Sequence, residues 1–189
     1  MPNLSAKPLW PNVRADVARF RSEETGMRTL VRGLLSQGFQ ALLVYRIFHW
    51  FHERAIPTQP IRFVFERFIE ITTGISLPVE AAIGKGLRIH HFGGIIIHPQ
   101  VVIGEGCTLY HGVTLGDLGV RSGAPRIGNR VVIGAGAKVI GAIEVGDDSR
   151  IGANAVVVNS VPAGHMAIGV PAVARPIGNL KLHSVSVTL

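Results

Sequence analysis

A spacing of six residues between aliphatic side chains runs through most of the second half of the chain and limits how it can fold. The series extends from Leu77 to Val157, with an interval of eight at Ile89–Ile97 and a wider gap at Leu115–Ile127. A strand of so few residues cannot bury an apolar face alone, but stacked turns bring these side chains into one interior column. Three six-residue sides per turn predict a triangular parallel β-solenoid with neighbouring coils about 4.8 Å apart.

The residues before the repeat have a different pattern, that of amphipathic helices. Apolar side chains recur at helical spacing within residues 13–70, and Pro57 and Pro60 separate a long run from a second one at Ile61–Ile69. Most of the 23 glycines lie beyond Gly74, where tight corners are needed. We therefore predict a helical N-terminal region at 1–74, the β-solenoid at 75–168 and a C-terminal extension at 169–189.

The composition restricts the partners and the compartment of this chain. A formal charge of +7 over 189 residues favours an anionic partner, but the repeat has no basic run with interleaved aromatic residues that would indicate nucleic acid. A single cysteine, Cys107, allows no intramolecular disulfide, and its inward repeat position predicts a core side chain. No stretch reaches the roughly 18 apolar residues of a membrane span, and the N-terminus lacks a signal-peptide pattern. We expect a cytoplasmic protein with no membrane span and no nucleic-acid partner.

Two irregularities interrupt the repeat, and irregularities in a solenoid are where function tends to lie. One is the segment at 90–94, His-His-Phe-Gly-Gly, and the other is a loop at 116–126. His91 and His111 each stand two positions after an inward aliphatic residue, so both should face outward at a corner, one coil apart. An outward imidazole can take the proton of a hydroxyl that attacks a thioester. His91 is therefore the candidate general base, and the alternative is that these are ordinary surface histidines.

The segment Gly38–Phe51, GFQALLVYRIFHWF, resembles the GF-x-A-x-x-x-YR-x-x-HW helix of the serine O-acetyltransferases. Repeat segments at 83–97, 110–119 and 131–157 are similar to the coils of that family, and GVPAVARPI at 169–177 is similar to its ending. The resemblance covers about residues 16–177. It implies a left-handed β-helix, acetyl-CoA as the donor, no metal, and a homotrimer or a multiple of one with active sites between subunits. It also places His91 on the catalytic base of the family.

The resemblance implies binding residues for both substrates. Coenzyme A would lie along the outer edge of the coils, with Gly116, Ala135 and Ala153 beside its pantetheine arm and Arg175 near its phosphates. The acceptor would be bound among Glu23, Glu24, His90, His111, Arg121 and Arg126.

The chain also departs from the family pattern around the acceptor. Ser76 stands where the family has the aspartate that orients the catalytic imidazole, and His90 replaces an acid. The loop GDLGVRSGAPR lacks the Arg-His pair that holds the serine carboxylate, so Arg121 or Arg126 would have to replace it. The chain ends in Leu189, whereas family tails that dock into a sulfhydrylase end in isoleucine, so the resemblance gives little support to that partner. Serine is the first acceptor to test, a sugar or polysaccharide hydroxyl is the alternative, and a non-catalytic scaffold is a third hypothesis.

Overall fold

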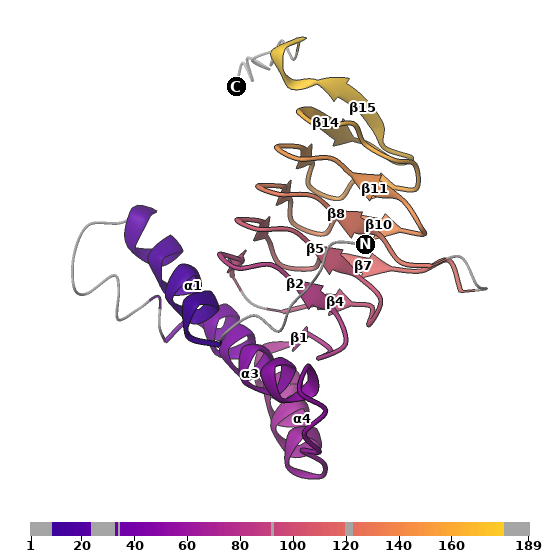
Figure 1. Cartoon of the computed structure of the whole chain (residues 1–189). Helices are drawn as coiled ribbons and strands as arrows, with labels where there is room; N and C mark the ends of the chain where they lie inside the picture. The colour runs from indigo at the N-terminus through magenta and orange to yellow at the C-terminus, as the bar shows by residue number, and fades with distance from the viewer. Residues whose placement is uncertain (1–8, 24–32, 34, 92, 120–122, 180–189) are drawn as a thin grey trace, which may run out of the picture.

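The computed structural model describes residues 9–23, 33, 35–91, 93–119 and 123–179. In this part of the chain, helices pack at one end of a β-solenoid (Figure 1). The helices are α1 (Leu9–Glu23), α3 (Gln37–His52) and α4 (Ile61–Thr73). α1 begins ahead of the predicted start at residue 13, and α4 continues past the predicted end of its apolar run to Gly74, whose φ of +65° ends the helix in the left-handed region.

Short strands form three sheets, one on each side of a triangular coil. Sheet A contains β1 (Ile75–Ser76), β4 (Ile95–Ile97), β7 (Thr114–Gly116), β10 (Lys138–Ile140) and β13 (Val156–Val157). Sheet B contains β2 (Ala82–Ile83), β5 (Val102–Ile103), β8 (Arg126–Ile127) and β11 (Glu144–Val145). Sheet C contains β3 (Arg88–Ile89), β6 (Thr108–Leu109), β9 (Val132–Ile133), β12 (Arg150–Ile151), β14 (His165–Ile168) and β15 (Val173–Pro176), followed by a 3₁₀ turn at Ile177–Asn179.

The register confirms the solenoid that the six-residue repeat predicts. Neighbouring strands within each sheet are parallel, except that β15 turns back antiparallel to β14. The aliphatic side chains of the repeat fill the interior, and Leu109, Leu115 and Ile133 have no exposed surface. Cys107 is also fully buried, and burial raises the pKa of its thiol to about 11.

The motif in α3 fastens the helices to the first coil. The edge strand β2 and its flanks present backbone carbonyls that no further strand covers among the described residues. The Tyr45 hydroxyl donates to the Ala81 carbonyl at 2.6 Å, and the Arg46 guanidinium donates to the carbonyls of Ile83 and Gly84, both at 2.6 Å. These side chains therefore satisfy the backbone at the open end of the solenoid, where an unpaired edge would otherwise face the helices.

Asp16 of α1 completes this joint. Its carboxylate accepts from Arg46 Nε at 2.9 Å and from the backbone N–H groups of Gly86 at 2.7 Å and Leu87 at 3.2 Å. Asp16 and Arg46 are 1% and 2% exposed, so the pair is removed from water. Burial raises the pKa of the Asp16 carboxyl above its ordinary value even with Arg46 beside it.

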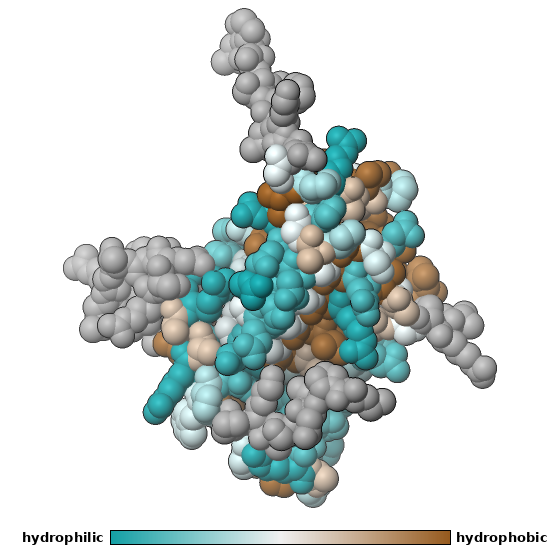
Figure 2. All heavy atoms as spheres, turned by 45° about the horizontal axis from the view of Figure 1, so that its top comes forward, coloured by the Kyte–Doolittle hydropathy of each residue, from teal (hydrophilic) through white to brown (hydrophobic). Residues whose placement is uncertain are grey.

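Exposed apolar side chains are concentrated on α4 and are also present on the β14–β15 hairpin. On α4 the side chains of Ile61, Val64, Phe65, Phe68 and Ile71 are exposed, and only Ile69 and Thr73 of this helix are buried. At the other end, the β14–β15 hairpin exposes Ile168, Val170 and Val173. Figure 2 shows polar and apolar residues interspersed on the face seen from that side. No helix among the described residues is long and apolar enough to cross a membrane.

Candidate active site

The interval of eight in the repeat is a two-residue insertion at the corner between sheet C and sheet A. The His90 N–H donates to the Leu109 carbonyl at 2.8 Å, and the Gly112 N–H donates to the Gly93 carbonyl at 3.0 Å. This register leaves His91 without a counterpart in the next coil. We call this edge of the solenoid, formed by residues 90, 91, 93, 94, 110–112, 134–136 and 152–154, the histidine corner.

The inserted residue His91 has an unusual backbone. Its φ is +64°, a left-handed conformation that costs a non-glycine residue about 1–2 kcal/mol. Gly93 and Gly94 follow the insertion with positive φ, and Gly74 packs against it, where an added Cβ atom would lie only 3.0 Å from the Gly93 Cα. The His91 side chain is exposed. The fold therefore maintains a strained backbone that presents an imidazole to solvent, which is typical of functional sites.

Aromatic rings surround His91. The His111 ring lies edge-on to it, with centroids 5.6 Å apart, so the predicted proximity of the two imidazoles is confirmed. His90 stacks on Tyr110 with centroids 4.8 Å apart, and the His91 ring is 6.2 Å from both of these rings. Tyr110 was not among the residues predicted from the sequence. The signal was present, because the repeat usually has glycine directly after the inward aliphatic residue, and here the positions hold His90 and Tyr110.

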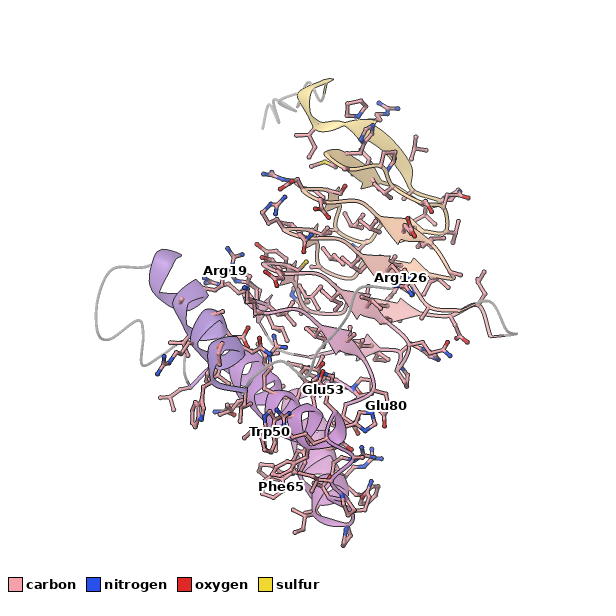
Figure 3. The ribbon with its side chains drawn as sticks, in the orientation of Figure 1. Arg19, Trp50, Glu53, Phe65, Glu80 and Arg126 are labelled. Atoms are coloured by element: carbon pink, nitrogen blue, oxygen red, sulfur yellow. The ribbon has the colours of Figure 1, made fainter. Side chains whose placement is uncertain are left out.

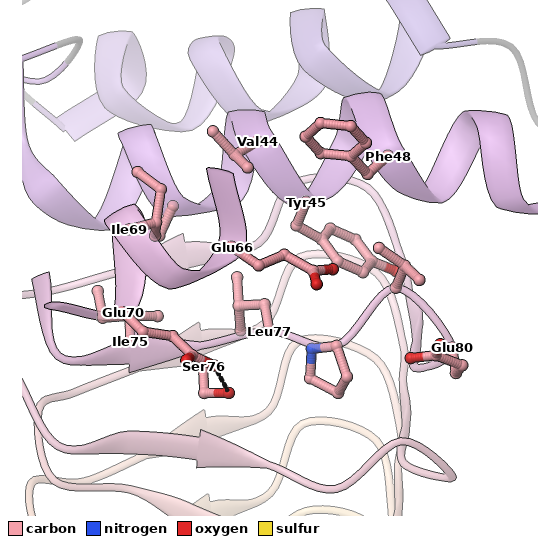
Figure 4. A pocket seen from close by; sticks show the side chains of 13 residues that line it. Val44, Tyr45, Phe48, Glu66, Ile69, Glu70, Ile75, Ser76, Leu77 and Glu80 are labelled. Carbon is pink, nitrogen blue, oxygen red and sulfur yellow. Dashed lines mark hydrogen bonds between the residues drawn. The ribbon is translucent and has the colours of Figure 1, made fainter. Parts of the chain in front are cut away.

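Ring packing, and not a carboxylate of the described residues, positions His91. Among the described residues no group forms a hydrogen bond to the His91 ring. Ser76, at the position of the aspartate of the family, donates instead to Glu70 Oε1 at 2.7 Å (Figure 4). Glu70 and Ser76 line a cavity of about 120 Å³ beneath α4, together with Glu66 and Glu80. Burial raises the pKa of Glu66 there, and the neighbouring carboxylates of Glu80 and Glu70 add to the effect.

Small side chains continue the histidine corner beyond His111. Ala135 follows His111 one coil further on, because the Gly136 N–H donates to the His111 carbonyl at 2.8 Å, and Ala153 follows Ala135 in the same way. Arg175 is exposed on β15. Four strand spacings of about 4.8 Å separate the His111 coil from β15, a rise of about 19 Å. An open row of alanines with a cation near its far end suits an extended chain that carries phosphates.

The other predicted binding residues lie elsewhere in the chain. Gly116 ends β7 at the opposite side of sheet A from the histidine corner, and Arg126 lies beyond the loop on β8, where it is exposed (Figure 3). Glu24 and Arg121 lie outside the described residues. Glu23 is the last residue of α1, and its side chain is outside what the structure describes. Within one chain, the structure therefore brings together His90, His91 and His111 but not Gly116 or Arg126.

The end of α1 lies beside the same sheet as the histidine corner. Arg19 donates to Thr108 Oγ1 at 3.2 Å and to the Gly106 carbonyl at 3.4 Å, which fixes the last turns of α1 against β6. Tyr110 follows directly after β6.

Among the described residues, no group of three or more His, Cys, Asp or Glu side chains is placed to hold a metal ion.

Comparisons with known proteins identify the family. The model of the bacterial transferase hexapeptide family, described as six repeats, matches residues 124–159. The serine acetyltransferase of Helicobacter pylori strain J99 is 48% identical over 146 residues, which is 74% of this chain and 81% of that protein. The serine acetyltransferase of Mycobacterium tuberculosis is 38% identical over 162 residues, which is 84% of this chain and 70% of that protein.

Solved structures agree with the sequence comparison. A serine acetyltransferase in complex with cysteine has a TM-score of 0.80 at 31% identity, covering 88% of this chain and 70% of that chain. The serine acetyltransferase of Brucella abortus in complex with coenzyme A has a TM-score of 0.81 at 30% identity, covering 90% of this chain and 69% of that chain. The fold is thus the left-handed parallel β-helix that the resemblance implied. The chain belongs to the serine acetyltransferase family, and it is an acyltransferase.

Proposed function

We propose that this enzyme transfers the acetyl group of acetyl-CoA to the hydroxyl of L-serine, with His91 as the general base. The observation that carries the proposal is the exposed His91–His111 pair at the start of the alanine row. Family membership supports the choice of substrates, because structures of relatives contain serine, cysteine or coenzyme A. O-acetylserine is the product expected of such an enzyme in cysteine biosynthesis.

The chemistry needs one base and no covalent enzyme intermediate. His91 takes the proton of the serine hydroxyl while its oxygen attacks the thioester carbonyl, and a tetrahedral intermediate forms. The carbon–sulfur bond then breaks, and the imidazolium returns the proton to the departing thiolate, so that O-acetylserine and free coenzyme A result. The edge-on contact with His111 and the strained backbone at position 91 restrict the ring before substrate arrives.

Coenzyme A binds along the histidine corner in this proposal. Its thioester lies next to His91 and His111, its pantetheine arm passes Ala135 and Ala153, and its phosphates approach Arg175. Small side chains leave the row open, and an exposed guanidinium favours phosphate oxygens.

A second copy of the chain completes the site. Gly116 lies at the far end of sheet A and Arg126 lies beyond it on sheet B, so we infer that they face a histidine corner from a neighbouring subunit. We therefore infer a homotrimer or a multiple of it, in which the 116–126 loop of one copy meets His91 of another. The exposed apolar face of α4 supports burial against another copy. In this arrangement Arg121 or Arg126 supplies positive charge to the acceptor, and Glu23, Glu24 and His90 lie around its amine.

We also propose that the enzyme is cytoplasmic and that the helical region and the solenoid meet at Gly74. A buried thiol with a raised pKa, as at Cys107, fits a reducing cytoplasm. Gly74, where α4 ends and sheet A begins, is the boundary between a helical region at 1–74 and a solenoid at 75–168. Part of the extension at 169–189 is β15, which pairs with β14.

An acceptor panel tests the function. Release of coenzyme A thiol from acetyl-CoA is measured with L-serine, with simple sugars and with a polysaccharide, and the acetylated product is identified by mass spectrometry. Saturation by serine and formation of O-acetylserine are expected. If a sugar saturates the enzyme and serine does not, the function would instead be acetylation of a glycan hydroxyl. If no acceptor causes thiol release, the protein would more closely fit a non-catalytic scaffold.

A further inference from the structure

Lys138 holds a fixed positive charge beside the histidine corner. It lies on β10, and its ammonium Nζ donates to the Gly112 carbonyl at 2.7 Å and to Thr114 Oγ1 at 3.0 Å. Both acceptors belong to the coil below, and Gly112 directly follows His111. The half-buried side chain is therefore fastened at its tip, one residue away from the ring that contacts His91.

The charge of Lys138 has no carboxylate partner in the described part of the chain. Two other cations in the solenoid do: Lys85 lies 3.4 Å from Glu105, and Arg130 lies 2.7 Å from Asp148. An ammonium has three N–H donors, and the two neutral acceptors of Lys138 use two of them. The third donor and the full positive charge remain available to an anion.

Part of the surface between this charge and His91 is open. A Cβ atom built on Gly93, two residues after His91, would meet nothing within 4 Å apart from its own chain neighbours. On sheet A, Ile96 pairs with Thr114 one coil below Lys138 and is 57% exposed. An acceptor lying on this part of sheet A would have His91 on the corner side and the Lys138 ammonium on the strand side.

The 116–126 loop of this chain has Arg121 and Arg126 but lacks the adjacent Arg-His pair that would hold the carboxylate of serine from two sides. The resemblance implies an Arg-His pair in the 116–126 loop, and the sequence has Gly123 and Ala124 immediately before Pro125 and Arg126. We propose that Lys138 binds the carboxylate of the acceptor through its third N–H, an assignment that rests on the proposed serine acetylation. A charge-assisted hydrogen bond of this kind corresponds to a preference of roughly tenfold to a hundredfold for a carboxylate over a neutral group.

The test compares L-serine with L-serinamide, which keeps the hydroxyl and the amine but replaces the carboxylate with a neutral amide. Lys138→Gln removes the charge and keeps a donor toward Gly112, while Lys138→Arg keeps the charge. The measured quantity is the ratio of kcat/KM for serine to that for serinamide. We expect Lys138→Gln to lower this ratio at least tenfold, mainly through the KM for serine, with little change in the KM for acetyl-CoA. Lys138→Arg should retain most of the ratio.

Three results would overturn the assignment, and they are distinct. If Lys138→Gln lowers kcat/KM equally for both acceptors, Lys138 only fastens the corner. If it changes neither, the ammonium does not contact the acceptor. If the wild-type enzyme acetylates neither compound, the proposed function itself fails and this inference with it. Thr114→Val is the matched control, because it removes one bond to Lys138 but leaves the charge, and the serine preference should persist.

Discussion

Replacing Asp16 with alanine should destabilise the fold by about 3–5 kcal/mol, the usual loss when one member of a buried ion pair is removed. The change leaves the Arg46 guanidinium charged and 2% exposed, and it removes the acceptor of the Gly86 and Leu87 backbone N–H groups. A domain is stable by only about 5–15 kcal/mol, so the loss is a large part of the total. For a chain of this size it corresponds to a fall in Tm of roughly 10 °C.

The assay is thermal and urea unfolding followed by circular dichroism at one fixed protein concentration. Asp148→Asn is the matched control, because Asp148 also accepts two hydrogen bonds from an arginine, Arg130, both at 2.7 Å, but at an exposed site, and asparagine tolerates the φ of +58° there. That variant should unfold almost where the wild type does, since water screens exposed pairs. The double variant Asp16→Leu with Arg46→Met should recover little of the loss, because it leaves the Ile83 and Gly84 carbonyls and the Gly86 and Leu87 N–H groups without their partners. A change below about 1 kcal/mol for Asp16→Ala would refute the role given to this joint.

Further predictions concern stability and reactivity at other sites. Burial raises the pKa of Glu66 above its usual 4.5, so the stability of the fold falls as pH rises through the pKa of Glu66 in the folded protein. Glu66→Gln should therefore raise Tm at pH 7, and this gain should vanish at a pH below 4.5. Cys107 should not react with a thiol reagent in the native enzyme at pH 8 and should react fully in guanidinium, since its pKa is about 11; a fast native reaction would contradict its burial. Gly38→Ala places a Cβ atom 2.8 Å from the Ile89 Cβ and should lower stability by about 1–3 kcal/mol in chemical denaturation, whereas an unchanged midpoint would show that α3 can move away from β3.

The repeat made the solenoid predictable because each inward position follows from the spacing alone. It also located the insertion, since an interval of eight in a series of six must place two residues outside the coil. The handedness of the coil came only from the resemblance, because a period carries no chirality. The left-handed backbone at His91 also could not be predicted from the sequence, because it depends on how Gly74 packs against Gly93.

The helix motif shows a different limit of sequence reasoning. Tyr45 and Arg46 were recognised as part of a family signature, but their partners are carbonyls at positions 81–84, and no local pattern predicts such contacts. The hydrogen bond from Ser76 to Glu70 likewise joins a strand to a helix whose relative position is set by packing. The spacing did predict the outward histidines, whereas the cation at Lys138 was missed because a lysine on a strand face has no distinctive signal.

The most direct test of the account is the turnover of His91→Asn with serine and acetyl-CoA, measured together with the affinity for coenzyme A. Loss of a general base should lower kcat by about two to four orders of magnitude. The affinity of His91→Asn for coenzyme A should stay close to that of the wild type, because the proposed row of alanines for the pantetheine arm begins beyond the His91 ring. The control His52→Asn, on the exposed end of α3, should behave as wild type. If His91→Asn retained most of its turnover while His111→Asn abolished it, the base would be the other imidazole and the central claim would be wrong.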